Sequence, residues 1–375
     1  MGFIYPEIDI NMCIDCGMCK KVCAFQSATE LRKPLKVLGA AEKSMDIKNS
    51  ASGGIATILA DEIISQGGVV FGASFAEKDG QISVKHIPVK SKKDLLKLKG
   101  SKYVQSDMLD VFENIQILLN NGEKAIFIGT PCQTDAVRAF LRKDYDTLIL
   151  VDIICHGVPN IDFFQNYLDY LGKTRGGRIK DFKFRDKYAG WGLNASVIYD
   201  VDGREYKEFI DASESSYYTM FLSAEIYRQN CYNCKYACNK RCGDITLGDF
   251  WGVEKEHKEE LAENEEIHIQ DGFSVVLLNS QKGMDLWEEC SKKTFYFEST
   301  FEKASNYNQQ LCRPSKMGKN RLKIFAKYKE GGYEAVEKFY GPILKRKKIF
   351  SLLKKSIPEP IKQRLRNMVR NMTSI

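Results

Sequence analysis

The sequence lacks any run of about 20 apolar residues, the length that a helix needs to cross a bilayer, so no transmembrane helix is predicted. Its first residues, MGFIYPEID, contain neither the basic nor the apolar segment of a secretory signal. Pro6 stands where a myristoylation motif requires Ser or Thr. The 375 residues are enough for two domains. We therefore expect a cytoplasmic protein.

Acidic residues are scarce in one part of the chain. Residues 316–375 hold 17 Lys and Arg against 4 Asp and Glu, a net charge of +13, whereas the remaining residues sum to −6. A basic tail on an acidic body indicates separate roles for the two parts. Because the body carries no signature of a nucleic-acid-binding fold, we expect no nucleic-acid partner.

The basic tail has an amphipathic pattern. Apolar residues recur at helical spacing among Lys and Arg in 343–355 and again in 361–369, and Pro358 and Pro360 separate the two stretches. Helices of this kind lie on anionic membrane surfaces, which suggests peripheral membrane association. A helix packed on the body or on an acidic partner, or a solvated tail, would show the same pattern.

Twelve cysteines are many for a cytoplasmic chain, and disulfides are rare in that compartment, so metal or redox use is favoured. Cys13, Cys16, Cys19 and Cys23 have the spacing with which ferredoxins hold a 4Fe-4S cluster. Zinc sites more often use two separated pairs. Ferredoxin runs end in Cys-Pro, but Ala24 follows here, and there is only one run. Whether Cys23 closes this cluster is therefore open.

The hydrophobic pattern predicts α/β structure early in the chain and mixed structure later. A helix is expected from Ile55, a strand at 69–73 and a helix near 107–120. A βαβ unit follows, with strands at 124–128 and 147–154 around a helix at 132–141, which makes those strands parallel. After a helix at 163–171, strand-like alternation begins near residue 179. We expect four parts, namely a ferredoxin-like module at 1–35, an α/β domain at 45–175, a mixed domain at 176–315 and the basic tail at 316–375.

Four further cysteines have the arrangement of a second cluster site. Cys132 and Cys155 each follow a strand of the βαβ unit, so both should lie at the carboxyl edge of the sheet, where α/β proteins place their sites. Cys231 and Cys234 add a pair at ligand spacing. Cys132 could equally be a packed thiol or a redox nucleophile.

The other cysteines carry weaker signals. Cys238 and Cys242 could share a helical face as ligands, or could be spare thiols or packing residues. Cys290 and Cys312 stand alone, and we expect them in the core or on the surface.

Several short motifs are suited to a bound nucleotide. Ser52, Gly53 and Gly54 precede a helix, where free amides favour phosphate, although a plain helix N-cap would look the same. Lys102 and Tyr103 could offer a cation and an aromatic face, or be surface residues. His156 could transfer protons in catalysis or hold its loop in place. Gly248–Gly252 indicates a turn with an aromatic wall, or a core aromatic pair at a strand end.

In their order, these segments resemble the coenzyme F420 hydrogenase/dehydrogenase beta-subunit family, and in particular a bacterial branch linked to polysaccharide clusters. The matching segments are CIDCGMCKKVC, SASGGIATILA, GGVVFGASF, LKGSKYVQSD, GTPCQ, DIICHGVP, FRDKYAGWG, CYNCKY and DITLGDFWG. The resemblance implies a ferredoxin-like module, a flavin-binding α/β domain at 45–175 and a C-terminal domain. Many members carry two ferredoxin runs before the SGG segment, so one or two 4Fe-4S clusters are expected here.

The same resemblance implies FAD and the residues that surround it. It implies that Cys132, Cys155, Cys231 and Cys234 together hold a 4Fe-4S cluster near the flavin. The residues that match flavin-surrounding segments are Ser52, Gly53, Gly54, Lys102, Tyr103 and Thr130.

The expected function is therefore that of an iron–sulfur flavoprotein oxidoreductase. It would relay electrons between clusters and a flavin to a small molecule, a deazaflavin or a ferredoxin-type partner, with a role in polysaccharide biosynthesis suggested by the resembling branch. The alternative is an electron-transfer subunit of a larger complex without a substrate of its own.

Overall fold

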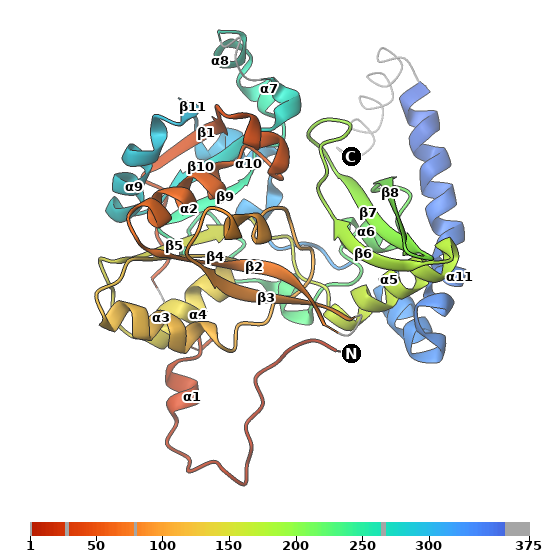
Figure 1. The fold of residues 1–375 in the computed structure, drawn as a ribbon, viewed down its shortest axis with the longest axis horizontal. Coiled ribbons are helices and arrows are strands. Elements are labelled where there is room, and N and C mark those ends of the chain that lie inside the picture. The colour runs from red at the N-terminus through yellow and green to blue at the C-terminus, as the bar shows by residue number, and fades with distance from the viewer. Residues whose placement is uncertain (1, 27–29, 79–80, 264–267, 357–375) are drawn as a thin grey trace, which may run out of the picture.

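A computed structural model describes residues 2–26, 30–78, 81–263 and 268–356, with side chains to Ile349. The chain forms a large mixed sheet with helices on both faces, and a smaller sheet with its own helices lies beside it (Figure 1). The expected mixed α/β architecture is thus confirmed. In the described part of the chain, no helix is both long and apolar enough to span a membrane.

The large sheet has eight strands in the order β11-β1-β10-β9-β5-β4-β2-β3. Its central strands β2, β4, β5 and β9 are parallel, and the strands toward both edges are antiparallel. The parallel pairing of β4 with β5 confirms the predicted βαβ unit. The bounds are β1 Lys36–Glu42, β2 Val69–Lys78, β3 Gln81–Val89, β4 Ala125–Gly129, β5 Leu148–Ile153, β9 Ile245–Asp249, β10 Ser274–Leu278 and β11 Thr294–Glu298.

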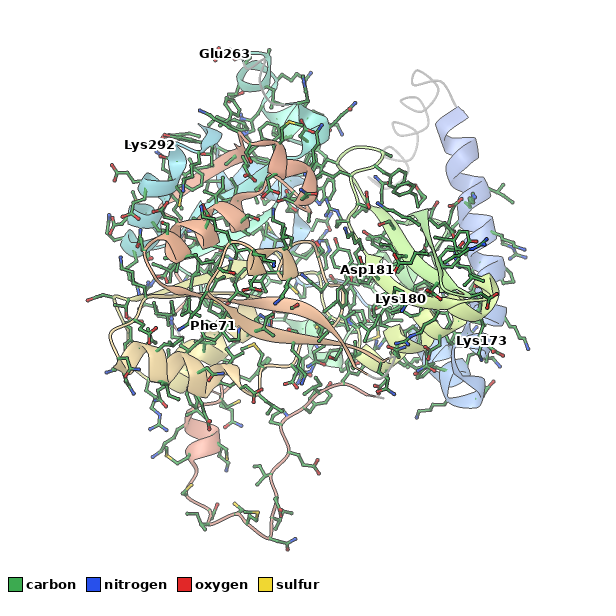
Figure 2. The ribbon with its side chains drawn as sticks, in the orientation of Figure 1. Phe71, Lys173, Lys180, Asp181, Glu263 and Lys292 are labelled. Carbon is green, nitrogen blue, oxygen red and sulfur yellow. The ribbon has the colours of Figure 1, made fainter. Side chains whose placement is uncertain are left out.

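Helices cover both faces of this sheet because its strands bury side chains on both sides. Phe71 and Phe127 pack toward α3 and α4, whereas Val70 and Ile126 pack toward α2 and α9. Phe71 lies inside the molecule in Figure 2, while Lys173, Lys292 and Glu263 project from its periphery. The bounds are α2 Ile55–Ser65, α3 Val111–Asn120, α4 Pro131–Leu141, α7 Val253–Glu256, α8 Lys258–Ala262, α9 Gln281–Ser291 and α10 Phe301–Asn306. Short 3-10 helices are η1 Met45–Asn49, η2 Asp94–Lys97, η3 Gln229–Asn233, η4 Ile269–Asp271 and η5 Gln309–Leu311.

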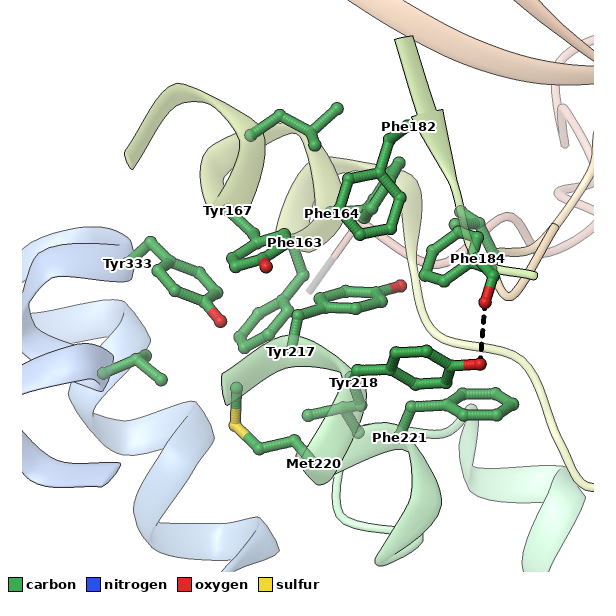
Figure 3. Packing of buried hydrophobic residues seen from close by; sticks show 14 of the residues in the cluster. Phe163, Phe164, Tyr167, Phe182, Phe184, Tyr217, Tyr218, Met220, Phe221 and Tyr333 are labelled. Atoms are coloured by element: carbon green, nitrogen blue, oxygen red, sulfur yellow. Dashed lines mark hydrogen bonds between the residues drawn. The ribbon is translucent and has the colours of Figure 1, made fainter. Parts of the chain in front are cut away.

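The smaller sheet, β6-β7-β8, is antiparallel and packs with α5, α6 and α11 around an aromatic core (Figure 3). Phe164 and Tyr217 have ring centroids 4.9 Å apart, and the Tyr218 hydroxyl donates to the Phe184 carbonyl at 2.9 Å. Buried tyrosines of this kind satisfy their hydroxyl groups as well as packing. The bounds are α5 Ile161–Arg175, β6 Arg178–Lys183, β7 Asn194–Val201, β8 Arg204–Asp211, α6 Ser216–Leu222 and α11 Arg321–Ser356.

The expected parts do not all appear as separate units. Strands β9, β10 and β11 from the 176–315 segment complete the sheet that residues 36–153 begin, so the boundary at 175 does not separate two sheets. Within the described residues of 1–35, the structure has one short helix, α1 Met18–Lys21, and one isolated bridge from Arg32 to Arg241. The ferredoxin-like module expected at 1–35 stays a prediction.

The predicted tail helix begins as part of the body. Residues 343–349 belong to α11, whose kink lies at Gly331 and Gly332, and Ile343 and Leu344 pack against the aromatic core. The Lys347 ammonium donates to Ser223 at 2.9 Å. This packing matches the alternative of a helix held on the body. Residues 361–369 lie outside the described residues, so membrane contact stays a prediction.

Replacing Ile324 by Ala should lower the free energy of unfolding by about 2–5 kcal/mol, because Ile324 is 0% exposed in the aromatic core. Leu322 lies two residues away on the same helix and is 81% exposed, so Leu322→Ala should change it by less than about 0.5 kcal/mol. Urea unfolding measures both values, and equal effects would contradict the packing of α11.

Candidate functional site

A cavity of about 390 Å³ opens at the carboxyl ends of β4, β5 and β9. This is the edge at which open α/β sheets bind ligands, and the volume falls in the range of small-molecule sites. The smaller unit contributes Arg185, Leu193 and Phe221 to the wall. Segments of the larger unit that line it are 50–52, 54–57, 98–104, 128–130, 153–158 and 247–249.

The Ser52-Gly53-Gly54 turn brings the first turn of α2 to the cavity. A Cβ on Gly53 would lie 2.4 Å from the Ala40 carbonyl oxygen, so only glycine fits against β1. Gly54 has φ +81°, a left-handed conformation that favours glycine. The Ser52 hydroxyl donates to the Phe273 carbonyl at 2.8 Å, which holds the turn against β10. The two glycines therefore allow the turn to pack closely against β1, and the N-terminus of α2 then faces the cavity.

Lys102 and Tyr103 both line the cavity. The Lys102 ammonium donates to the carbonyls of Leu98 and Lys99, each at 2.8 Å, so it is not the surface lysine of the alternative expectation. Burial lowers the pKa of Lys102 to about 7. The Tyr103 ring stacks on Phe221 with centroids 4.3 Å apart. Lys102 thus fixes the loop from η2, and Tyr103 joins that loop to α6.

A buried ion pair in the cavity wall was not singled out from the sequence. The Arg185 guanidinium binds both carboxylate oxygens of Asp249, at 2.7 and 2.9 Å, and donates to the Ala51 carbonyl at 2.8 Å. Although burial alone lowers the pKa of Arg185, Asp249 raises it above its usual value. Arg185 lies in the segment FRDKYAGWG and Asp249 in the segment GDFWG. The opposite charges in these two segments were the only sequence signal that could have suggested the ion pair.

The aromatic residues of GDFWG divide between core and cavity. Phe250 is fully buried, whereas Trp251 lines the cavity and stacks on Trp191 with centroids 4.8 Å apart and planes 5° apart. Trp191 Nε1 donates to Asp249 at 2.8 Å. The expected aromatic wall and the expected core aromatic therefore both occur, one at each residue.

Cys132, Cys155, Cys231 and Cys234 come together beside the cavity. All four are half-buried, and burial raises the pKa of each thiol, to about 11 for Cys231. The other three thiols raise the pKa of Cys155 further, which places all of them within electrostatic range. Cys155 also lines the cavity.

The spacing of these thiols bears on what they can bind. Within the described residues, no three His, Cys, Asp or Glu side chains gather closely enough to hold one metal ion. The sulfur ligands of a single Zn²⁺ would lie about 3.8 Å apart, since Zn–S bonds are about 2.3 Å. A 4Fe-4S cluster spreads its thiolates over separate irons and so tolerates wider spacing. The all-sulfur donor set fits such a cluster.

The other cysteines of the body differ in burial and in the contacts of their thiols. Cys242 is buried, and its thiol donates to the Pro131 carbonyl at 3.2 Å. Cys238 is half-buried and contacts the Lys240 carbonyl at 3.4 Å. Cys290 is buried in the core and Cys312 is exposed, in agreement with the expectation for both.

The first four cysteines lie on an arm that leaves the body (Figure 1). Cys13, Cys16 and Cys19 are exposed, and Cys23 is half-buried. The Asp15 amide lies 3.4 Å from the Cys13 sulfur, and Gly17 has φ +68° where α1 begins. The turns that ferredoxin runs use to aim thiolates are thus present in part.

His156 lies at the cavity, next to Cys155. His156 as a whole residue is exposed. Desolvation by the surrounding protein lowers the pKa of its imidazole, although Asp249 acts in the opposite direction. Its position at the cavity makes His156 a candidate for proton exchange with a bound ligand.

Fold and site together define an α/β protein with a ligand cavity and four converging thiols, an arrangement suited to redox chemistry. The N-terminal and C-terminal models of the coenzyme F420 hydrogenase/dehydrogenase beta subunit match residues 37–113 and 122–303. The chain belongs to this family, whose members are electron-transferring oxidoreductase subunits.

The individual proteins that the chain resembles share little sequence identity with it. The uncharacterized protein MJ1349 of Methanocaldococcus jannaschii is 26% identical over 141 residues, which are 36% of this chain and 39% of that protein. The match thus spans well under half of the relative's length. A chain of the F420-reducing [NiFe] hydrogenase complex from Methanosarcina barkeri is 17% identical, with a TM-score of 0.47 over 80% of this chain and 94% of that one.

Asp249→Asn should lower the free energy of unfolding by about 3–5 kcal/mol, because it leaves the charge of Arg185 buried without a partner. Arg175 and Glu208 form a similar two-point pair at 2.6 and 2.7 Å but are partly exposed. Glu208→Gln should therefore cost less than about 1 kcal/mol. Denaturant unfolding measures the loss of free energy of unfolding in each variant. Equal losses would contradict the inference that the Arg185–Asp249 pair is the more buried and more costly one to break.

Proposed function

We propose that the chain is an iron–sulfur flavoprotein oxidoreductase in which Cys132, Cys155, Cys231 and Cys234 bind a 4Fe-4S cluster and the adjoining cavity binds FAD. The observation that carries the proposal is the convergence of three half-buried thiols on Cys155, which itself lines a cavity on the carboxyl edge of the sheet. A 4Fe-4S cluster supplies one-electron transfer, and a flavin exchanges electrons singly or in pairs.

The residues around the cavity fit a flavin nucleotide. The N-terminus of α2 offers backbone amides and the positive end of a helix dipole, which favour phosphate. Ser52, Gly53 and Gly54 shape that end, and Lys102 and Tyr103 border the cavity from the opposite loop. Hydrophobic side chains such as Leu95, Leu98 and Leu247 exclude water from its interior.

His156 is the residue placed to exchange a proton with a substrate in the cavity. It lines the cavity, and an imidazole can both accept and donate a proton near neutral pH. The Asp249 carboxylate favours the protonated form that follows.

The exposed run Cys13, Cys16, Cys19 and Cys23 would bind a second 4Fe-4S cluster. Its position on an arm favours exchange of electrons with a ferredoxin-type protein or another subunit. A deazaflavin or a small molecule, including a precursor in polysaccharide biosynthesis, would be the acceptor at the flavin.

The second candidate is an electron-transfer subunit without a substrate of its own, which the family's beta-subunit description favours. Turnover of a small-molecule acceptor by the isolated, cofactor-loaded chain would exclude it.

Cys132→Ala should remove about four irons per chain and leave the iron of the N-terminal run. Cys290→Ala is the matched control, since that thiol is buried in the core away from the site. Iron and sulfide are measured on anaerobically reconstituted protein. Retention of all iron in the Cys132 variant would refute the assignment of that cluster.

Ala56→Trp should abolish flavin binding and leave the iron content unchanged, because Ala56 is exposed and lines the cavity. Ala262→Trp introduces the same ring at an exposed site on α8 and should bind flavin normally. Flavin is released by denaturation and quantified by chromatography. If reconstituted parent protein contained no flavin, the cofactor assignment would fail.

A further inference from the structure

A chain of hydrogen bonds leads away from the Cys132 sulfur along the cavity wall. Thr130 Oγ1 lies 3.2 Å from Cys132 Sγ and donates to Gln133 Oε1 at 2.9 Å. Gln133 Nε2 in turn donates to Ser106 Oγ at 2.7 Å. Thr130, Gln133 and Ser106 all line the cavity.

The chain ends at a buried histidine, which fixes its direction. His86 Nε2 lies 3.1 Å from the Ile128 carbonyl, which only accepts, so Nε2 carries the ring proton. Nδ1 is then the acceptor for the Ser106 hydroxyl at 3.0 Å. Burial lowers the pKa of His86 to about 4, so the ring stays neutral near pH 7. Because Ser106 donates to His86, it accepts from Gln133, and the amide oxygen of Gln133 must face Thr130.

The Thr130 hydroxyl has one proton and two acceptors within reach, Gln133 Oε1 and Cys132 Sγ. A free thiol can donate its own proton to Thr130 Oγ1, which leaves the hydroxyl proton on Gln133. A sulfur bonded to iron has no proton and carries negative charge, so it becomes the stronger acceptor, and the hydroxyl proton can turn from Gln133 to the sulfur. Gln133 Oε1 then keeps the Thr130 backbone N–H at 3.1 Å, and no polar atom is stranded.

We propose that Thr130 is a positioning residue that donates its hydroxyl hydrogen bond to the iron-bound sulfur of Cys132 and thereby raises the reduction potential of that cluster. The proposal rests on the proposed function and gives Thr130 a role toward the sulfur rather than the flavin. An electron added to the cluster increases the negative charge on its sulfurs. The hydrogen bond is therefore stronger in the reduced state, which favours reduction.

The test uses the full chain with Cys13, Cys16 and Cys19 changed to Ser, so that one cluster is observed. Thr130→Val removes the hydroxyl at nearly constant volume, and Thr130→Ser keeps it. In an EPR-monitored redox titration, Thr130→Val should reduce the equilibrium constant for cluster reduction about tenfold, or ~59 mV for one electron. Thr130→Ser should match the parent.

A second measurement does not depend on the Val variant binding iron. Iron–sulfur stretching bands in resonance Raman spectra of the parent and of Thr130→Ser should shift in D₂O, because deuterons replace the hydroxyl proton as well as the backbone amide protons of Cys132 and Gln133 at the sulfur. Where Thr130→Val takes up iron, its bands should shift less. The absence of a D₂O shift in the parent, or equal potentials for Thr130→Val and the parent, would overturn the role of Thr130. A parent chain that takes up no iron would overturn the proposed function itself.

Discussion

Four half-buried cysteine sulfurs within electrostatic range of one another are the constraint on which the site depends. Burial raises the pKa of every one of these thiols, and each thiolate formed would make the next harder to form. Backbone hydrogen bonds to Cys155 and Cys231, and the nearby Arg228, act in the opposite direction without reversing the effect. The ionised set therefore requires a strongly positive partner, and for the proposed cluster this links iron binding to deprotonation of the thiols.

The fold brings these sulfurs together from three separate places. The parallel register of β4 and β5 fixes the loops that carry Cys132 and Cys155 at one edge of the sheet. The third loop, 231–242, belongs to no strand and is held by a buried ion pair. Arg241 donates to Asp152 of β5 at 2.7 Å, and Asp152 also accepts the Gly243 amide at 2.8 Å. Since Arg241 is 2% exposed, loss of this pair would leave a buried charge and release the loop.

The sequence was informative where periodicity and spacing are local. Strands β4 and β5 and helix α4 were predicted within two residues, and the edge they form located Cys132 and Cys155. The pairing of β1 with β10 and β11 could not be predicted, because it joins residues 36–42 to residues 274–298 and leaves no local pattern. Arg185 and Asp249 were missed for the same reason, being 64 residues apart and recognisable as a pair only after folding. Lys102 is a different case. The sequence placed it correctly at the cavity, but its ammonium donates to backbone carbonyls and does not point to a free cation for a nucleotide.

The N-terminal arm is tied at both ends to the segment that carries Cys231 and Cys234. The Arg228 guanidinium lies 4.0 Å from the ring centroid of Tyr5, before the cysteine run. After the run, Lys235 donates to the Ala24 carbonyl, and Phe25 packs edge-on against Tyr236 at 6.5 Å. A tether at both ends limits how far Cys13 to Cys23 can move from the second set of thiols, which raises their effective concentration there. The cost is the modest entropy of closing a short loop. One segment, 228–236, thus carries Cys231 and Cys234 and also anchors the arm that holds Cys13 to Cys23.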